Sequence, residues 1–378
     1  MYKRHMEKIL KKWLPAKEII ILYGARQVGK TTLVRELLKD ISQSLIINCE
    51  NTSVASVLES RDLQAIKVLF GPNRTVVLDE AQTLDNIGAI LKNIFDELPE
   101  YKIIATGSSS FDLSTKVTEA LTGRNLKFSL YPLSVDEIKQ KNGWLYVVES
   151  LKELMIYGMY PGVVIMESWQ KQKKVTELAS DYLFKDLLTF EQVKDSSSIR
   201  KMLRALALQV GNQVSVNELS NLTGLSRPMV EKYLDLLEKC FIIFRLESFS
   251  SNLRNEIKKS NKFYFIDNGI MNALTGNFNP LSNRTDTGIL WENFVISEIV
   301  KQYNNQQLGA NYYFWRTYDG AEIDLIIEIN QELHAFEIKW SPKRKAKLPE
   351  SFRNKYNVQD LITINPNNFH ILFDLIKK

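Results

Sequence analysis

The stretch that decides the fold of the amino-terminal part is Gly24-Ala25-Arg26-Gln27-Val28-Gly29-Lys30-Thr31-Thr32. It follows the apolar run 19–22 and precedes leucines at helical spacing, so we expect a buried strand, a loop and a helix. Glycine at both ends of the loop allows backbone conformations closed to other residues, so that successive N–H groups turn inward around an anion. The positive end of the following helix dipole adds to this attraction. The spacing therefore predicts a phosphate-binding loop.

Lys30 and Thr31 are residue types that can bind a triphosphate and its metal ion. The Lys30 ammonium supplies a charge for the β- and γ-phosphates, and the Thr31 hydroxyl is a ligand for Mg²⁺. We therefore expect residues 24–32 to bind ATP together with Mg²⁺. Two roles are open for Arg26, a contact with phosphate or an ion pair with a neighbouring acid.

Two carboxylates at the end of the apolar run 75–78 are predicted to form the second half of the ATP site. Asp79 would hold the water shell of Mg²⁺ opposite Thr31, and Glu80 would orient or deprotonate the attacking water. A further strand is expected at 101–105, followed by polar residues. In P-loop ATPases of the additional-strand type a polar residue here senses the γ-phosphate, and Ser108 or Thr106 could do so. A plain turn is the alternative.

Arg124 follows Gly123, which fits the end of a helix, and precedes a strand expected at 126–130. Two roles are open for its side chain. It could reach the γ-phosphate of a neighbouring subunit as an arginine finger, or it could pair with a surface acid. The first role requires a homo-oligomer.

Length and composition set the class of protein. The 378 residues allow two or three domains, and 44% hydrophobic with 25% charged residues is ordinary for a globular protein. A net charge of +5 permits nucleic acid as a partner without arguing for it. The two cysteines, Cys49 and Cys240, exclude a disulfide framework and a thiolate metal cluster. No run approaches about 18 apolar residues and no signal peptide is evident, so we expect a cytoplasmic protein that does not engage a membrane.

Several segments together carry a family resemblance: GARQVGKTT, TVVLDE, IIATGSSS, LTGRNLKFSLYPLS and the later YPGV. They resemble a prokaryotic family of AAA-superfamily P-loop ATPases, and the resemblance spans nearly the whole chain. It implies an AAA-type core that uses ATP and Mg²⁺. It also implies a C-terminal domain, of uncertain function, that resembles restriction-endonuclease folds.

The expected fold is α/β, with four parts in order along the chain. These are a P-loop core with a parallel sheet at 1–132, a helical lid at 133–197, a winged-helix unit at 198–275 and a nuclease-like α/β domain at 276–378. The winged-helix expectation rests on a helix at 216–222, a turn around Gly224 and a second helix from Ser226 to Lys239. Basic residues on the second helix are matched by acidic ones, so both DNA reading and protein packing stay open for it.

A second group of charged residues lies in the last third of the chain: Glu292, Asp324, Glu337 and Lys339. Glu337 and Lys339 would project to one side of a strand, and a turn near 330–331 would fold the Asp324 strand beside theirs. The spacing resembles the PD-(D/E)xK nuclease arrangement. Asp324 and Glu337 would bind a second divalent metal, Lys339 would stabilise the attacking hydroxide, and Glu292 would complete the cluster.

The competing interpretation of this group is a set of ordinary cross-strand ion pairs on an exposed hairpin. Four basic residues follow just beyond, where a nucleic-acid backbone would run: Lys343, Arg344, Lys345 and Lys347. The sequence therefore predicts Mg²⁺-dependent ATP hydrolysis by Lys30, Thr31, Asp79 and Glu80, coupled to action on DNA or RNA. The alternative is an ATP-driven switch whose C-terminal domain is a catalytically inert platform for protein or DNA.

Overall fold

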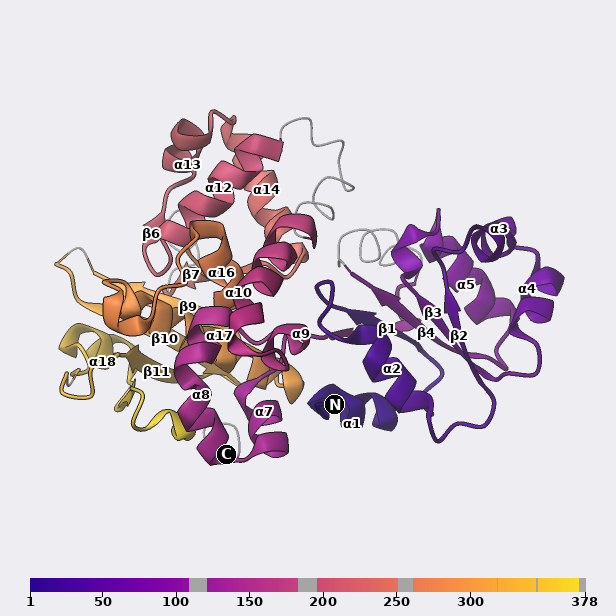
Figure 1. Ribbon diagram of the computed structural model, residues 1–378, viewed down its shortest axis with the longest axis horizontal. Coiled ribbons are helices and arrows are strands. Elements are labelled where there is room, and N and C mark those ends of the chain that lie inside the picture. Colours follow the sequence, from indigo (N-terminus) through magenta and orange to yellow (C-terminus); the bar gives the residue numbers. More distant parts are fainter. Residues whose placement is uncertain (109–120, 183–195, 251–260, 318, 345, 374–378) are drawn as a thin grey trace. The chain divides into compact units, whose positions relative to one another are not determined.

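The computed structural model describes residues 1–108, 121–182, 196–250, 261–317, 319–344 and 346–373 (Figure 1). These residues form two compact units. Unit 1 comprises Met1–Leu133 and the short segment Lys239–Phe241, and unit 2 contains nearly all the remaining described residues. The expected helix between the fourth and fifth strands falls on 109–120, outside the described residues.

Unit 1 is built on a five-stranded sheet in the order β2-β3-β4-β1-β5. Its strands are β1 (Ile19–Tyr23), β2 (Ser44–Asn48), β3 (Thr75–Asp79), β4 (Lys102–Gly107) and β5 (Asn125–Ser129). All neighbouring pairs are parallel. Every residue of β1 and β3 is buried, as expected for strands covered on both faces, whereas the edge strands β2 and β5 are more exposed. The expected strands are confirmed to within two residues at each end.

Strand order explains how the ATP residues meet. β4 lies between β1 and β3, as expected for an additional-strand P-loop ATPase. Because the carboxyl ends of parallel strands share one edge of the sheet, the residues after β1, β3 and β4 converge there.

The helices of unit 1 cover both faces of its sheet. They are α1 (His5–Trp13), α2 (Lys30–Leu38), α3 (Thr52–Ser60), α4 (Leu63–Phe70), the 3₁₀ turn Ala81–Thr83 and α5 (Ile87–Glu97). In Figure 1, α1 and α2 lie on one side of the sheet and α3, α4 and α5 on the other. Side-chain caps set two of the starts, because Asn51 and Asp62 accept hydrogen bonds from backbone N–H groups of α3 and α4.

Unit 2 begins with the helices of the predicted lid. They are α7 (Val135–Asn142), α8 (Trp144–Tyr157), α9 (Pro161–Val164) and α10 (Ser168–Glu177). A capping box between Ser134 and Glu137 starts α7. Within the unit, α8 and α10 pack against α16 (Asn268–Thr275).

The predicted helix-turn-helix is confirmed as a pattern of elements. α13 (Val216–Thr223) ends at Gly224, which has φ +74°, and α14 (Arg227–Lys239) follows. α12 (Ser196–Leu208) packs on α13. Three strands accompany these helices, namely β6 (Gln213–Val214), β7 (Ile243–Ser248) and β8 (Asn261–Phe265).

The last third adds four strands and the long helix α17 (Thr287–Asn305). The strands are β9 (Asn311–Arg316), β10 (Glu322–Ile329), β11 (Glu332–Ile338) and β12 (Leu361–Ile364), with α18 (Glu350–Tyr356) before the last. β10 and β11 form a hairpin whose turn residues, Asn330 and Gln331, have φ +50° and +70°. The expected pairing of the Asp324 strand with that of Glu337 is confirmed.

One seven-stranded sheet runs through unit 2, in the order β12-β11-β10-β9-β7-β8-β6. The parallel pair β7 and β9 joins the strands beside the helix-turn-helix to the C-terminal strands. The predicted boundary at 275–276 therefore falls inside a continuous sheet. No helix in the described ranges has the length and apolar character needed to cross a bilayer.

Candidate functional site

The phosphate-binding loop connects β1 to α2, as the sequence predicts. Gly24 packs so closely on the segment after β5 that an added Cβ would lie 2.2 Å from the Leu130 carbonyl oxygen. Gly29 has φ +98°, a conformation that favours glycine, and Gln27 also has positive φ at +61°. Both glycines of the motif are thus required by the backbone, one by close approach and the other by its dihedral angle.

Lys30 is the first residue of α2 and its side chain turns back over the loop. Its Nζ donates hydrogen bonds to the carbonyl oxygens of Gly24, at 2.7 Å, and Ala25, at 3.1 Å. The residue is only 5% exposed. This charge, the loop amides and the amino end of α2 fit an anionic group such as a phosphate chain.

The remaining loop residues differ in exposure. Ala25 and Val28 are buried, Arg26 is partly buried, and Gln27 and Thr32 face solvent. Thr32 therefore belongs to the exposed surface of α2 and not to the phosphate-binding loop.

Thr31 and Asp79 meet across the sheet edge. The Thr31 hydroxyl donates to Asp79 Oδ2 at 2.8 Å, although the two residues are 48 positions apart. A hydroxyl and a carboxylate oxygen in contact are oxygen donors of the kind Mg²⁺ prefers, so these residues fit the predicted metal role.

Thr106 contacts the acidic pair at the end of β3. Its hydroxyl donates to Asp79 Oδ1 and accepts a hydrogen bond from the Glu80 backbone N–H at 3.3 Å. The side chain is fully buried. Both hydrogen bonds of Thr106 therefore go to the acidic pair, and a γ-phosphate sensor at Ser108 or Thr106 stays a prediction.

Glu80 is held by a residue that sequence reasoning missed. Its backbone is left-handed, with φ +55°, and Gln82 Nε2 donates to Glu80 Oε2 at 2.6 Å. The same Nε2 lies 3.2 Å from Ser108 Oγ. A polar residue two positions after the acidic pair was the available signal, because the sharp turn at Glu80 brings it back over the carboxylate.

Arg124 lies at the other end of the sheet from the phosphate loop. Its carbonyl accepts from Ile19 N at the start of β1, roughly 16 Å from the loop by strand geometry. Its Nε pairs with Asp96 Oδ1 at 2.9 Å, and both side chains are 34% exposed. The surface ion pair, one of the two roles considered, is present. The trans role stays a prediction.

In unit 2 the structure brings Asp324, Glu337 and Lys339 together on the β10–β11 hairpin. Lys339 Nζ lies 2.5 Å from Glu337 Oε1 and 3.4 Å from Asp324 Oδ2. Asp324 Oδ2 also accepts from the Ile338 backbone N–H at 2.8 Å. The expected projection of Glu337 and Lys339 to one side is confirmed.

Burial changes the protonation of this group. It raises the pKa of Glu337, and the nearby charge of Asp324 raises it further. For Lys339, burial lowers the pKa, but the attraction of Asp324 and Glu337 outweighs it and the net pKa is raised. Lys339 therefore stays charged between the two carboxylates.

Glu292 on α17 belongs to the same electrostatic group. Burial first, and then the charge of Asp324, raise its pKa to about 7. Tyr264 Oη donates to Glu292 Oε1 at 2.7 Å, and Lys262 pairs with Glu322 nearby. In the described part of the chain, however, no three His, Cys, Asp or Glu side chains are grouped so that they could hold a metal ion. The geometry therefore does not supply the second metal site that the sequence predicts.

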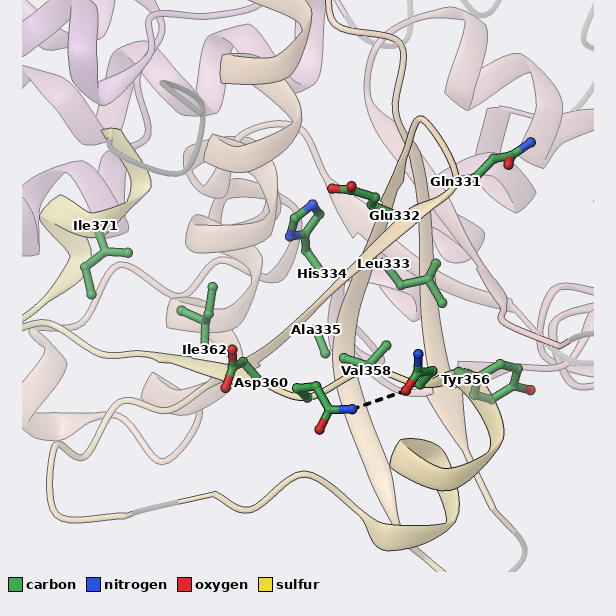
Figure 2. Close-up of a pocket in the computed structure, with 12 residues that line it drawn as sticks. Gln331, Glu332, Leu333, His334, Ala335, Tyr356, Val358, Asp360, Ile362 and Ile371 are labelled. Atoms are coloured by element: carbon green, nitrogen blue, oxygen red, sulfur yellow. Dashed lines mark hydrogen bonds between the residues drawn. The ribbon is translucent and has the colours of Figure 1, made fainter.

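Unit 2 contains a cavity of about 750 Å³, and Figure 2 draws the residues that line it. It lies beside β11 from the first residues of that strand to Ala335, where the pairing with β12 begins, and Ile362 of β12 also lines it. Its lining residues are Gln331, Glu332, Leu333, His334, Ala335, Tyr356, Asn357, Val358, Gln359, Asp360, Ile362 and Ile371. None of the sequence-predicted site residues is among them. Of the four basic residues expected near a nucleic acid, Lys345 lies outside the described residues.

Comparisons with known proteins match three parts of the chain. Residues 16–139 match an AAA domain model. Residues 148–281 and 287–375 match two domains of unknown function, DUF8612 and DUF4143.

Similar proteins extend over most of the chain. An uncharacterized protein of Mycobacterium tuberculosis is 25% identical over 334 residues, which is 87% of this chain and 72% of that protein. An uncharacterized protein of Haemophilus influenzae is 24% identical over 94% of this chain and 88% of its own length. A Walker-type ATPase of Pyrococcus abyssi shares the fold at 18% identity and a TM-score of 0.50, with 72% of this chain and 96% of that chain covered. The fold, the loop geometry and the domain match together identify unit 1 as a P-loop ATPase core of the AAA type.

Proposed function

We propose that this protein hydrolyses ATP at the edge of the unit 1 sheet, with Lys30, Thr31, Asp79 and Glu80 as the working residues. The observation that carries the proposal is the hydrogen bond between Thr31 and Asp79, which joins the phosphate loop to the acidic strand end. A phosphate loop can occur without an acidic strand end beside it, and an acidic strand end can occur without a phosphate loop. An ATP–Mg²⁺ site needs the two in contact.

The residues of the site have separate roles in the proposed reaction. The loop amides and Lys30 hold the phosphates, while Thr106 and Gln82 orient Asp79 and Glu80. Glu80 accepts the proton of a water that attacks the γ-phosphorus in line, while the bond from that phosphorus to the bridging oxygen breaks and ADP leaves. Mg²⁺, held by Thr31 and through water by Asp79, would offset the negative charge of the phosphates.

The test compares single substitutions in the full-length chain. We expect Lys30→Ala to abolish MgATP binding in calorimetry, and Glu80→Gln to bind MgATP while losing turnover by about 100-fold or more. Lys39→Ala, at the exposed end of the same helix, is the matched control and should behave as wild type. Nucleotide binding that survives Lys30→Ala unchanged would refute the proposal.

A second candidate function concerns nucleic acid and the group of Glu292, Asp324, Glu337 and Lys339. The grouping of three carboxylates and one lysine, from segments up to 47 residues apart, favours it over chance surface pairs, because Asp324 is buried and Glu292 is half-buried. Lys339 lies between the carboxylates of Asp324 and Glu337, and in the described residues these side chains are not grouped as a metal site. Cleavage would therefore require Lys339 to leave the carboxylates, so that Asp324 and Glu337 could hold a divalent metal and Lys339 could stabilise the developing charge on a phosphodiester.

Cleavage assays on DNA and RNA with Mg²⁺ or Mn²⁺ separate this function from an inert platform. We expect Asp324→Ala and Lys339→Ala to lose cleavage while keeping wild-type ATP turnover. Glu350→Ala, on α18, serves as the control. If the wild type and all three variants are equally inert on every substrate, the C-terminal part is a binding platform and ATP turnover acts as a switch on partner capture.

A further inference from the structure

Arg4 is a buried charge in unit 1 that composition and periodicity do not single out. It immediately precedes α1 and is only 7% exposed. One guanidinium nitrogen, Nη1, donates to the Val28 carbonyl oxygen at 2.7 Å, and the other, Nη2, donates to the Tyr131 carbonyl oxygen at 2.6 Å. Arg4 thus joins the start of the chain to the phosphate loop and to the segment after β5.

The contact with Val28 fixes the direction of a loop amide. The peptide between Val28 and Gly29 is planar and trans, so its C=O and N–H point in opposite directions. Because Arg4 holds the carbonyl on its own side, the Gly29 N–H must point to the opposite side, away from the guanidinium. In a phosphate-binding loop that N–H is one of the donors that surround the anion.

The contact with Tyr131 gives this arrangement a fixed support. Gly24, at the start of the loop, already packs against the Leu130 carbonyl, and Leu130 N donates to Tyr23 O at 2.7 Å. The same short segment therefore supports both ends of the loop, through direct packing at Gly24 and through Arg4 at Val28.

Simple anchoring of α1 does not require Arg4. Met6 and Leu10 are fully buried beneath the helix. Lys102 Nζ fixes the chain beyond the helix through the carbonyl oxygens of Trp13, Ala16 and Glu18, at 3.2, 2.6 and 2.6 Å. The guanidinium group of Arg4 instead contacts the phosphate loop at Val28. A buried positive charge there also favours the binding of an anion.

We propose that Arg4 is a positioning residue of the phosphate loop, which orients the loop amides for the nucleotide before it binds. The inference rests on the proposed ATP site and adds a residue that lies outside the AAA domain match at 16–139. An arginine suits the role because its planar fork reaches two carbonyl oxygens at once, which a lysine ammonium on a flexible stem does less well.

The experiment measures MgADP binding to the full-length chain by calorimetry, so that turnover does not interfere. We expect Arg4→Met to raise the Kd at least about tenfold and Arg4→Lys to give an intermediate increase. Lys102→Met is the matched control, because it removes three hydrogen bonds from the chain around α1 without touching the loop. It should lower the melting temperature and leave the Kd unchanged.

The outcomes separate this inference from the proposed function. Wild-type binding that is lost in Lys30→Ala establishes the ATP site by itself, and an unchanged Kd in Arg4→Met then overturns only the role of Arg4. An equal loss of affinity in Lys102→Met would also overturn it, because anchoring of α1 would explain both. If Arg4→Met does not fold, Arg4→Lys decides, and a wild-type Kd in that variant refutes the inference. Absence of any nucleotide binding by the wild type would overturn both proposals.

Discussion

At the scale of single residues, the hydrogen bond from Gln82 to Glu80 determines how the proposed base is presented to water. Glu80 sits in a left-handed conformation, which a non-glycine residue adopts only when its surroundings hold it there. The Gln82 amide, 2.6 Å from the carboxylate, is the closest such restraint on the side chain. We expect Gln82→Ala to lower kcat about tenfold and to leave MgADP affinity unchanged.

A double-mutant cycle tests whether Gln82 acts through Glu80. In the Glu80→Gln background, Gln82→Ala should cause little further loss, because residues that act as a unit are not additive. Lys92→Ala, at an exposed position of α5, controls for general effects on the unit. If the double variant instead shows the product of the two fold-losses in kcat, Gln82 acts independently of Glu80.

A second residue-scale prediction follows from the raised pKa of Glu292, about 7 against a usual 4.5. The folded protein keeps this proton up to about pH 7, while the unfolded chain releases it near 4.5. The proton on Glu292 therefore stabilises the folded state fully below about pH 4.5, and this stabilisation is lost as the pH rises through 7. We expect Glu292→Gln to remove this loss, and so to be more stable than wild type at pH 8 by on the order of 2 kcal/mol.

Denaturant unfolding at pH 5 to 8, followed by tryptophan fluorescence, measures the effect. Five of the six tryptophans lie in unit 2, among them Trp291 on the same helix as Glu292. Glu50→Gln, at an exposed position in unit 1, should leave the pH profile unchanged. A constant difference between wild type and Glu292→Gln across this range would show that Glu292 has an ordinary pKa.

At the scale of elements, the local sequence was sufficient to predict a structure that is formed by residues close together in the chain. The strand, loop and helix around 24–32 and the hairpin turn at Asn330 and Gln331 are of this kind. A contact between distant segments was predictable where a motif names both partners, as for Thr31 and Asp79. Other long-range contacts were not, since periodicity carries no information about them. The bond from Arg4 to Tyr131 spans 127 positions and that from Thr106 to Asp79 spans 27. Nothing in the local sequence around Arg4 therefore indicated that its side chain contacts the phosphate loop.

The junction of α8 with α16 is another long-range contact, and it makes a prediction about stability. Gly158 ends α8 with φ +77°, and an added Cβ would lie 1.9 Å from Asp267 Oδ1. Asp267 is itself fixed, because it accepts hydrogen bonds from Met159 N at 2.6 Å and Gly269 N at 2.9 Å. We expect Gly158→Ala to destabilise unit 2 by about 3 kcal/mol or more in denaturant unfolding.

Gly143 provides the matched comparison, because it ends α7 with φ +87° and ψ 165°, close to the +77° and −170° of Gly158, but has no atom within 4 Å of an added Cβ. Gly143→Ala should show the backbone contribution alone, about 1–2 kcal/mol, and so cost less than Gly158→Ala. Equal losses in the two variants would show that the contact with Asp267 relaxes freely.

At the scale of the whole molecule, the α/β core with its parallel sheet followed from the motifs, whereas the continuous sheet of unit 2 did not. The sequence predicts a boundary at 275–276, and β7 pairs with β9 across that position. Only the pairing of strands about 65 residues apart makes the sheet continuous, and no local pattern encodes such pairing. The Asp324, Glu337 and Lys339 group was found because strand alternation is local, whereas the contact of Glu292 with Tyr264 was not.

Subunit assembly is the remaining property at this scale, and Arg124 makes it testable. Its ion pair with Asp96 is partly exposed, so breaking it costs only about 0–1 kcal/mol and leaves the guanidinium free to serve a neighbouring subunit. If Arg124 acts in trans, a mixture of Arg124→Ala and Lys30→Ala subunits regains ATP turnover. The first variant supplies an intact phosphate loop and the second an intact arginine. We expect turnover in a 1:1 mixture to exceed the mean of the separate variants, and the wild-type rate per subunit to rise with protein concentration. A mixture that equals the mean, with a rate independent of concentration, would leave Arg124 with its surface ion pair alone.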